Sequence, residues 1–245
     1  MRDASIAELP RPPRGAEKTT SATLVYAKLR RDILNGTMKP GQKLLIEQVA
    51  QRYDTGINPV REALNRLSAE RLVDRRDQRG FFVPPLTLEA FAELVKSRCW
   101  LEGLALEQSI LNRDKAWEDA VITTHFRLDR EPIRLAGESD SDNSAWEERH
   151  RAFHNALIGR CGSVWLETFC QDMMDHAERY RFASMSACYP RRDSREEHRQ
   201  IMEATLDGDV PNAVSRLQEH YRLTLQRLQE QTTLAGTEEP AETGQ

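Results

Sequence analysis

The segment from Asn58 to Leu67 limits the possible fold of this chain more than any other. Asn58 is a favourable helix N-cap, and Pro59 suits the first helical position because its missing N–H would have no partner there. Apolar residues follow at the i, i+3, i+4 and i+7 spacing of a buried helix face: Val60, Ala63, Leu64 and Leu67. The segment therefore predicts a helix with one buried face, and its other face carries Arg61, Asn65 and Arg66.

Short elements are predicted on both sides of this helix. Residues 21–34 form a first helix that Ser21 caps and Asn35-Gly36 ends, and residues 45–53 form a second, short helix. Residues 72–76 and 81–83 are predicted as strands around a basic turn at residues 77–80. Three helices followed by a small β-hairpin wing are typical of a winged helix-turn-helix, which we place at residues 21–84, after a disordered N-terminal tail at residues 1–20.

The exposed face of the third helix has side chains that suit DNA. Arginine pairs bidentately with guanine, asparagine pairs with adenine, and a helix N-terminus favours a phosphate. In a winged helix-turn-helix the third helix enters the major groove and the wing lies along the backbone or the minor groove. We therefore predict DNA contacts from the helix and the wing tip: Asn58, Arg61, Asn65, Arg66, Arg79 and Gly80. Periodicity alone leaves open a helical module that does not bind DNA.

Net charge separates the chain into two parts of opposite sign. Residues 1–85 hold 16 Lys and Arg against 10 Asp and Glu, a net charge of +6, and residues 86–245 hold 19 against 29, a net charge of −10. A basic part joined to an acidic part is typical of a protein that binds a polyanion with one domain and has a different role for the other. Chance clustering within a single domain is the alternative on charge alone.

Pro84-Pro85 is the predicted joint between the two parts, because proline ends a strand. After it, periodicity predicts only helices, at about residues 88–112, 115–137, 144–160, 163–187, 194–206 and 211–231, with a break at residues 137–143. We therefore expect an all-α bundle of six or seven helices at residues 87–231 and a disordered tail at residues 232–245. The fold class is mainly α.

Neither end of the chain predicts export or membrane insertion. No apolar run approaches the roughly 18 residues of a membrane span, and residues 1–20 lack the apolar stretch of a secretory signal. The four cysteines, at positions 99, 161, 170 and 188, form no CxxC pair. We therefore expect a cytoplasmic protein that contacts no membrane and keeps its thiols reduced and buried.

Four of the six histidines are placed so that three helices could bring them together. His150 and His154 lie one turn apart on an apolar helix face, and His198 and His220 lie beside the apolar stripes of the last two helices. Neutral imidazoles in such an arrangement can bind a divalent metal ion. The alternative is that buried histidines only satisfy hydrogen bonds. The other two, at positions 125 and 176, match no such pattern and are expected to be structural or exposed.

The N-terminal motifs resemble those of a known family. Arg52-Tyr53, Asn58-Pro59-Val60-Arg61-Glu62-Ala63-Leu64, Leu67, Glu70-Arg71-Leu72-Val73 and Gly80-Phe81-Phe82-Val83 are together similar to the DNA-binding domain of GntR-family bacterial transcription regulators. The resemblance implies operator contacts at Arg61 and at the wing tip around Gly80. Ile57 departs from the family, because many relatives have arginine there, so we expect an operator that differs from the commonest one.

The C-terminal motifs resemble the ligand-binding FCD domain of the FadR-type branch of that family. The resemblance covers about residues 88–228 and rests on Arg98, Glu102, the string Trp146–His154, Glu197-His198, Gly208-Asp209 and His220. It implies that His150, His154, His198 and His220 hold a divalent metal ion facing a small-carboxylate pocket, and that Arg98 pairs with the effector. His150 stands where aspartate is common, and an all-nitrogen set favours Zn²⁺ or Ni²⁺. Arg179 and Arg181 are expected at the surface.

These observations predict a metabolite-responsive transcription regulator, and a repressor by the commoner arrangement in the family. A homodimer would bind double-stranded operator DNA, and a small organic acid at the metal would change the pose of the two winged helices. One alternative is a metal-dependent enzyme, which we disfavour because Glu147 and Glu148 point away from the two-histidine face and no other general base is evident. The other is a DNA-binding protein with a purely structural metal, which would respond to no effector.

Overall fold

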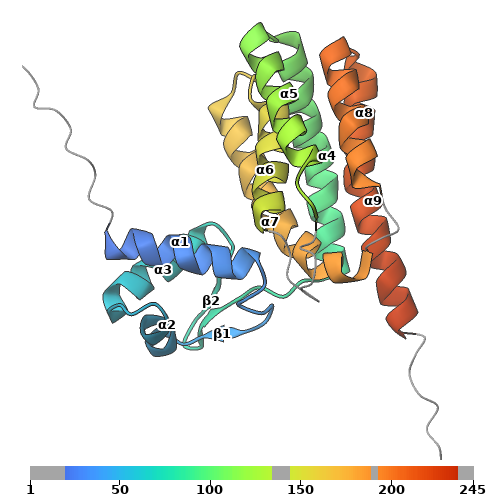
Figure 1. The fold of residues 1–245 in the computed structure, drawn as a ribbon. Coiled ribbons are helices and arrows are strands. Elements are labelled where there is room, and N and C mark those ends of the chain that lie inside the picture. Colours follow the sequence, from blue (N-terminus) through green and yellow to red (C-terminus); the bar gives the residue numbers. More distant parts are fainter. Residues whose placement is uncertain (1–19, 134–143, 189–192, 237–245) are drawn as a thin grey trace, which may run out of the picture.

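The computed structural model describes residues 20–133, 144–188 and 193–236, which form two bodies joined near residues 84–86 (Figure 1). The N-terminal body contains α1 (Ser21–Leu34), β1 (Lys43–Leu44), α2 (Ile46–Arg52), α3 (Ile57–Ala69), β2 (Asp74–Arg76) and β3 (Gly80–Phe82). The C-terminal body contains α4 (Leu88–Leu111), α5 (Lys115–Asp129), α6 (Ser144–Ile158), α7 (Val164–Cys188), α8 (Ser194–Asp207) and α9 (Val210–Gly236). The predicted fold class is confirmed, and the predicted break at residues 137–143 lies outside the described residues.

Two helices of the N-terminal body begin earlier than the sequence predicts, α1 by one residue and α3 by two. Thr20, not Ser21, caps α1, because its Oγ1 accepts a hydrogen bond from the Thr23 N–H at 3.2 Å. α3 begins after an extended Gly56, so Asn58 is its second residue rather than its cap. Pro59 is then the third residue, still within the first turn, where a backbone N–H has no helical partner. The helix therefore tolerates this proline.

The predicted hairpin is part of a three-stranded antiparallel sheet with the strand order β1-β3-β2. β3 pairs with β2 from Asp74↔Phe82 to Arg76↔Gly80, and its other edge pairs with β1. The turn between β2 and β3 has a φ of +92° at Gly80, which glycine adopts without steric cost. β1 has only two residues, too few to show the alternation by which a strand is recognised in a sequence, and the prediction missed it.

Each body has a hydrophobic core of its own. In the N-terminal core the predicted buried face of α3 is confirmed, because Val60, Ala63, Leu64 and Leu67 have no exposed surface. This face packs with apolar residues of α1, including Leu29 and Ile33. The exposed side of α3 is therefore held rigidly toward solvent, which is the condition for a recognition helix.

The C-terminal body is built around α4, which packs against α6, α7 and α9. Two element ends differ from the prediction. α5 ends at Asp129 instead of continuing to residue 137, and α9 includes residues 232–236, which the sequence assigned to the disordered tail. Among the described helices none is long and apolar enough to cross a bilayer. Cys99, Cys161 and Cys170 are buried free thiols, and the side chain of Cys188 lies outside the described set.

Candidate DNA-binding surface and metal centre

The solvent-exposed face of α3 carries the polar residues that the sequence predicts on it. Asn58, Arg61 and Asn65 are exposed on the side of the helix opposite its core face. Arg66 is also exposed, but its guanidinium lies over the ring of Tyr26 in α1, 4.1 Å from the centroid. Arg61 therefore points a cation to solvent, whereas Arg66 is partly committed to a contact within the domain.

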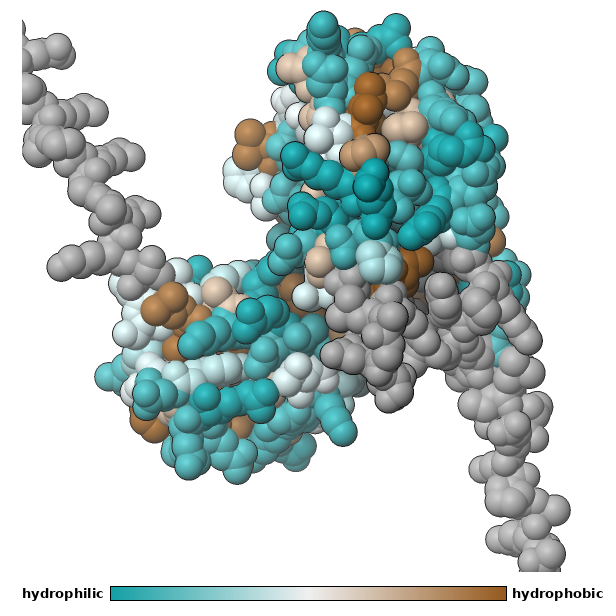
Figure 2. Space-filling model, viewed as in Figure 1, coloured by the Kyte–Doolittle hydropathy of each residue, from teal (hydrophilic) through white to brown (hydrophobic). Residues whose placement is uncertain are grey.

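The wing adds a second group of cations next to this helix. Arg79 and Gly80 are exposed at the turn between β2 and β3, as predicted. The structure adds Lys43 and Arg76, which lie over the Phe82 ring at 5.8 and 4.5 Å from its centroid. On the face shown in Figure 2 the N-terminal body is largely hydrophilic. The sequence did not single out Lys43, because the short strand that brings it to the wing carries no pattern.

The four predicted histidines meet at one point inside the C-terminal body. α6 supplies His150 and His154, α8 supplies His198, and α9 supplies His220. Each side chain is at most 5% exposed, and the nearest set of ring nitrogens, one from each histidine, lies within 4.8 Å of one another. Trp146, one turn before His150, stacks on its ring at 4.8 Å between centroids. Three helices thus bring four imidazoles together at a buried site.

Acidic and phenolic groups orient two of these imidazoles from behind. His220 Nδ1 lies 2.8 Å from Glu197 Oε2 of α8. His154 Nδ1 lies 3.1 Å from the hydroxyl of Tyr221, which donates to Glu102 Oε2 at 2.5 Å. In both cases the Nδ1 atom is engaged, so the Nε2 atom faces the cluster. In the sequence, Glu102 and Glu197 stand out only as family motif positions, and no pattern assigns a role to Tyr221.

The predicted effector contact, Arg98, lies deep in the same region. Its Nε and Nη2 donate to the two oxygens of Glu102 at 2.5 and 3.2 Å, and both side chains are almost completely buried. The guanidinium also lies over the Tyr221 ring, 3.9 Å from the centroid. Arg98 is therefore one buried residue away from the His154 imidazole.

Burial favours the neutral form of His150 and His154. It lowers the pKa of His150 well below the ordinary histidine value, and Arg181 and His154 act in the same direction. Burial, followed by His220 and His198, lowers the pKa of His154 in the same way. The neutral imidazole is the form that binds a metal ion, so the site favours the required protonation state.

The donor set fits a divalent metal ion. His150 Nδ1 and His154 Nε2 are buried and have no hydrogen-bond partner among the described residues. A buried polar atom left without a partner costs about 1–3 kcal/mol, and a cation coordinated by both atoms would remove this cost. Four neutral nitrogens are a donor set that suits Zn²⁺ or Ni²⁺ better than Mg²⁺ or Ca²⁺.

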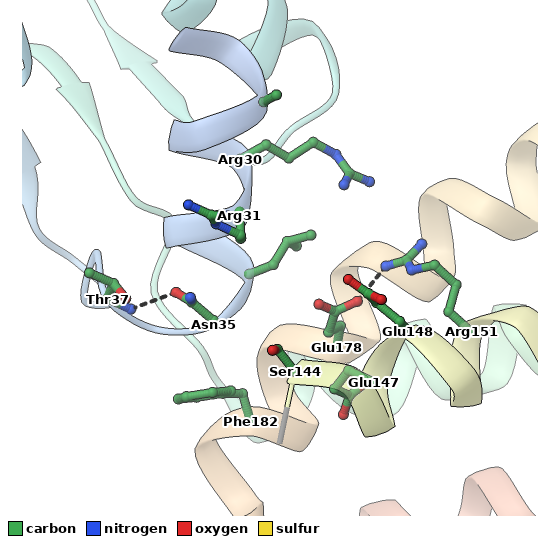
Figure 3. Close-up of a pocket in the computed structure, with 12 residues that line it drawn as sticks. Arg30, Arg31, Asn35, Thr37, Ser144, Glu147, Glu148, Arg151, Glu178 and Phe182 are labelled. Atoms are coloured by element: carbon green, nitrogen blue, oxygen red, sulfur yellow. Dashed lines mark hydrogen bonds and ion pairs between the residues drawn. The ribbon is translucent and has the colours of Figure 1, made fainter. Parts of the chain in front are cut away.

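A chain of ion pairs connects the histidine helix α6 to the DNA-binding body. Arg151, the neighbour of His150 in α6, pairs with Asp175 and Glu178 of α7, and Asp175 also pairs with Arg30 of α1. In Figure 3, Arg30 lies across a cavity from Arg151 and Glu178. This cavity, of about 400 Å³, separates α1 from α6 and α7.

Two further contacts from α7 hold the N-terminal body. A ring nitrogen of His176 lies 3.1 Å from the carbonyl oxygen of Glu70, and Arg179 donates to the carbonyl oxygen of Pro84 at 2.6 Å. The expectation that Arg179 and Arg181 lie at the surface is wrong. Arg179 is only 6% exposed, and Arg181 pairs with the buried Glu147 of α6 at 2.8 Å, because α7 packs against both α6 and the linker.

Two family descriptions match the two bodies. "Bacterial regulatory proteins, gntR family" matches residues 22–83, and "FCD domain" matches residues 93–223, more than half of the chain. The chain belongs to the GntR family. Its DNA-binding body and its helical body are the two modules of an FCD-type GntR regulator, as the motifs predicted.

Named relatives of this GntR regulator are transcription regulators. It is 34% identical to the Uncharacterized HTH-type transcriptional regulator BphR of Paraburkholderia xenovorans (strain LB400), over 82% of each chain. It is 29% identical to the HTH-type transcriptional repressor GlaR of Escherichia coli (strain K12), over 80% of this chain and 90% of that protein. The chain is therefore a DNA-binding transcription regulator and not an enzyme, which removes the metalloenzyme alternative.

Solved structures share the fold. A GntR family member from Pseudomonas syringae pv. tomato str. DC3000 matches with a TM-score of 0.53 and 25% identity over 89% of each chain. "E. coli McbR/YncC" matches with a TM-score of 0.71 and 20% identity, over 88% of this chain and all of that chain. At 20% identity, the match to McbR/YncC indicates a shared fold only.

Proposed function

We propose that this GntR regulator is a cytoplasmic, metabolite-responsive repressor whose C-terminal domain binds a divalent metal ion and a small carboxylate. The observation that carries the proposal is the cluster of four buried histidines beside the buried Arg98. The domain would act as a sensor for an organic acid, and the winged helix would act on the operator. The name of the repressor GlaR supports the direction of regulation.

His150, His154, His198 and His220 would hold the metal ion, with Zn²⁺ or Ni²⁺ favoured by the nitrogen donors. Four protein ligands leave coordination positions for a further ligand on an ion that expands beyond four-coordination. When bound, the ion supplies a positive charge that attracts a carboxylate. The buried Nδ1 of His150 has no hydrogen-bond partner among the described residues and would find one in this ion.

The effector would meet Arg98 as well as the metal. Glu102 engages Nε and Nη2 of this guanidinium, and a guanidinium has five N–H donors, so Nη1 remains as the end that an incoming carboxylate would meet. A cation and a guanidinium on one pocket favour a small mono- or dicarboxylate. The acidic group Glu102 makes the pocket selective for anions that compete well for this arginine.

A second copy of the chain would complete the repressor. Two recognition helices are needed to read two half-sites of a pseudo-palindromic operator. α4 and α7 are antiparallel neighbours, since Phe91 stacks on Tyr180 near one end and Asn112 bonds to the Arg160 carbonyl near the other. Their outer faces carry large apolar side chains that are 47–78% exposed: Trp100, Leu104, Leu111, Val164, Trp165 and Phe169. Such a surface on a regulator that reads symmetric DNA supports a homodimer.

Thermal unfolding of the purified protein tests the sensor. Zn²⁺ or Ni²⁺ should raise the melting temperature, because a ligand at 100 times its Kd stabilises the folded state by about 2.7 kcal/mol. One acid in a panel of small mono- and dicarboxylates should then raise it further, and EDTA should abolish this second shift. His154→Gln should remove both shifts, whereas His125→Gln, outside the cluster, should keep them.

Two results would contradict the proposal in different ways. No shift with either metal would refute the metal site. A collapse of the domain on chelation, with no response to any acid, would make the metal structural and would leave only the DNA-binding role of the chain.

A further inference from the structure

A chain of buried hydrogen bonds runs from α4 to the histidine cluster. Arg98 donates to both oxygens of Glu102, Tyr221 donates to Oε2 of the same carboxylate, and the Tyr221 oxygen lies 3.1 Å from His154 Nδ1. The four side chains come from α4, α9 and α6 and are at most 4% exposed. Both oxygens of the Glu102 carboxylate accept hydrogen bonds, Oε1 from Arg98 and Oε2 from Arg98 and Tyr221.

Stability alone is a weak reason for such an arrangement. Replacing a buried ion pair by well-packed apolar residues is often neutral or stabilising, because the desolvation of two charges offsets their attraction. Glu102 and Arg98 are nevertheless buried together in the middle of the bundle, with Tyr221 closing the contact to His154. The arrangement therefore points to a role in orienting the groups at its end.

The proton count along the chain determines the tautomer of His154. A tyrosine hydroxyl has one proton, and Tyr221 gives it to Glu102. The Tyr221 oxygen can then only accept from His154, so His154 carries its proton on Nδ1. His154 Nε2 is left with a lone pair, and it is the atom that points to the other histidines without a hydrogen-bond partner.

We infer that Tyr221 and Glu102 are positioning residues of the histidine cluster, which hold His154 in the Nδ1–H tautomer with Nε2 ready to coordinate. This inference rests on the proposed metal site. Arg98 holds the carboxylate of Glu102 in place from the other side.

The hydrogen bonds from Arg98 to His154 also connect the proposed effector contact to the metal site. Glu102 serves Arg98 and Tyr221 at the same time, so an anion that draws Arg98 away from Glu102 also alters the partner of Tyr221. The orientation and basicity of His154 then depend on whether Arg98 is occupied. Binding of the anion and binding of the metal would thus be linked through Glu102, Tyr221 and His154.

Tyr221→Phe tests the inference because it removes only the hydroxyl. Its matched control is Tyr180→Phe, a change of another buried tyrosine, which stacks on Phe91 away from the chain. Zn²⁺ affinity of the full-length variants is measured by competition with a chromophoric chelator. The loss of an outer hydrogen bond to a ligating histidine typically lowers metal affinity about 10- to 100-fold, so we expect this loss in Tyr221→Phe and wild-type affinity in Tyr180→Phe.

Imidazole ¹⁵N NMR of the metal-free wild-type protein provides a readout that needs no variant to fold. We expect His154 to be the Nδ1–H tautomer in this measurement. Its ¹⁵N signals are assigned by their loss in His154→Gln. An Nε2–H tautomer in the wild type, or wild-type Zn²⁺ affinity in Tyr221→Phe, would overturn the inference. Absence of Zn²⁺ binding by the wild type would instead refute the proposed metal site, and the NMR result would still decide the tautomer.

Discussion

Acidification of the metal-free protein should destabilise the helical domain by an amount that follows from two histidines. His150 and His154 are buried, and burial lowers the pKa of each well below the unfolded value of about 6.5. The unfolded chain binds protons at these residues as the pH falls through 6.5, and the folded chain does not. The contribution of these two histidines to the free energy of unfolding is therefore fully present above about pH 6.5, and it is lost as the pH falls from there toward their lowered pKa values in the folded protein.

The size of the loss can be worked from proton linkage. Between pH 7.5 and 5.5, a histidine with an unfolded pKa near 6.5 that stays neutral when folded costs about 1.4 kcal/mol, so the two cost about 2.7 kcal/mol together. Burial also lowers the pKa of His125 and His176, which adds to the loss. Burial raises the pKa of Glu178, which acts against the loss at the acid end of the range.

Urea unfolding followed by tryptophan fluorescence measures this effect in the correct domain. All four tryptophans, at positions 100, 117, 146 and 165, belong to the C-terminal part of the chain, and Trp146 stacks on His150. His154→Gln should reduce the pH-dependent loss by about 1.4 kcal/mol, the contribution of one histidine. A free energy of unfolding that stays constant or rises from pH 7.5 to 5.5 in EDTA would refute the reasoning. Metal affinity should decline only below about pH 6.5, the ordinary histidine pKa, because burial keeps His150 and His154 neutral to lower pH.

Three further outcomes are expected. Arg61→Ala should lower operator affinity about 10- to 100-fold in a fluorescence anisotropy titration with the chain's own upstream DNA, because a bidentate base contact contributes about 1–3 kcal/mol. The control is Arg127→Ala, which changes an exposed arginine of the C-terminal body. Equal affinities of the two variants would contradict the assignment of α3 as the recognition helix. Trp165→Glu should convert the proposed dimer to a monomer in light scattering, since it puts a charge on the exposed apolar face. A dimer mass equal to that of wild type would contradict a dimer contact at this face. Asp175→Asn should increase proteolysis near residues 84–86, because Arg30 and Arg151 both lose the carboxylate with which they pair. A cleavage rate equal to that of wild type would show that these ion pairs do not hold the two domains together.

Local patterns were sufficient to predict the elements that carry their own signal. The apolar spacing of α3 predicted its buried face, and the exposed positions of Arg61 and Asn65 follow from it. The cap of α3 was predicted wrongly, because Asn58 is a good N-cap by residue type but the backbone of Gly56 takes that position. The strand β1 was missed, because its pairing with β3 depends on a contact across about 40 residues of sequence.

Histidine spacing alone determined that His150 and His154 share one helix face, because residues four apart lie one turn apart on any α-helix. Tertiary structure decided the rest of the site. Only the packing of α8 on α5 and α9, and of α9 on α4, brings His198 and His220 to the two histidines of α6, and only the approach of α4 to α9 places Glu102 against Tyr221. Helix periodicity specifies which side of an element is buried, whereas the partner it meets there depends on how distant helices pack, and no local pattern records that choice.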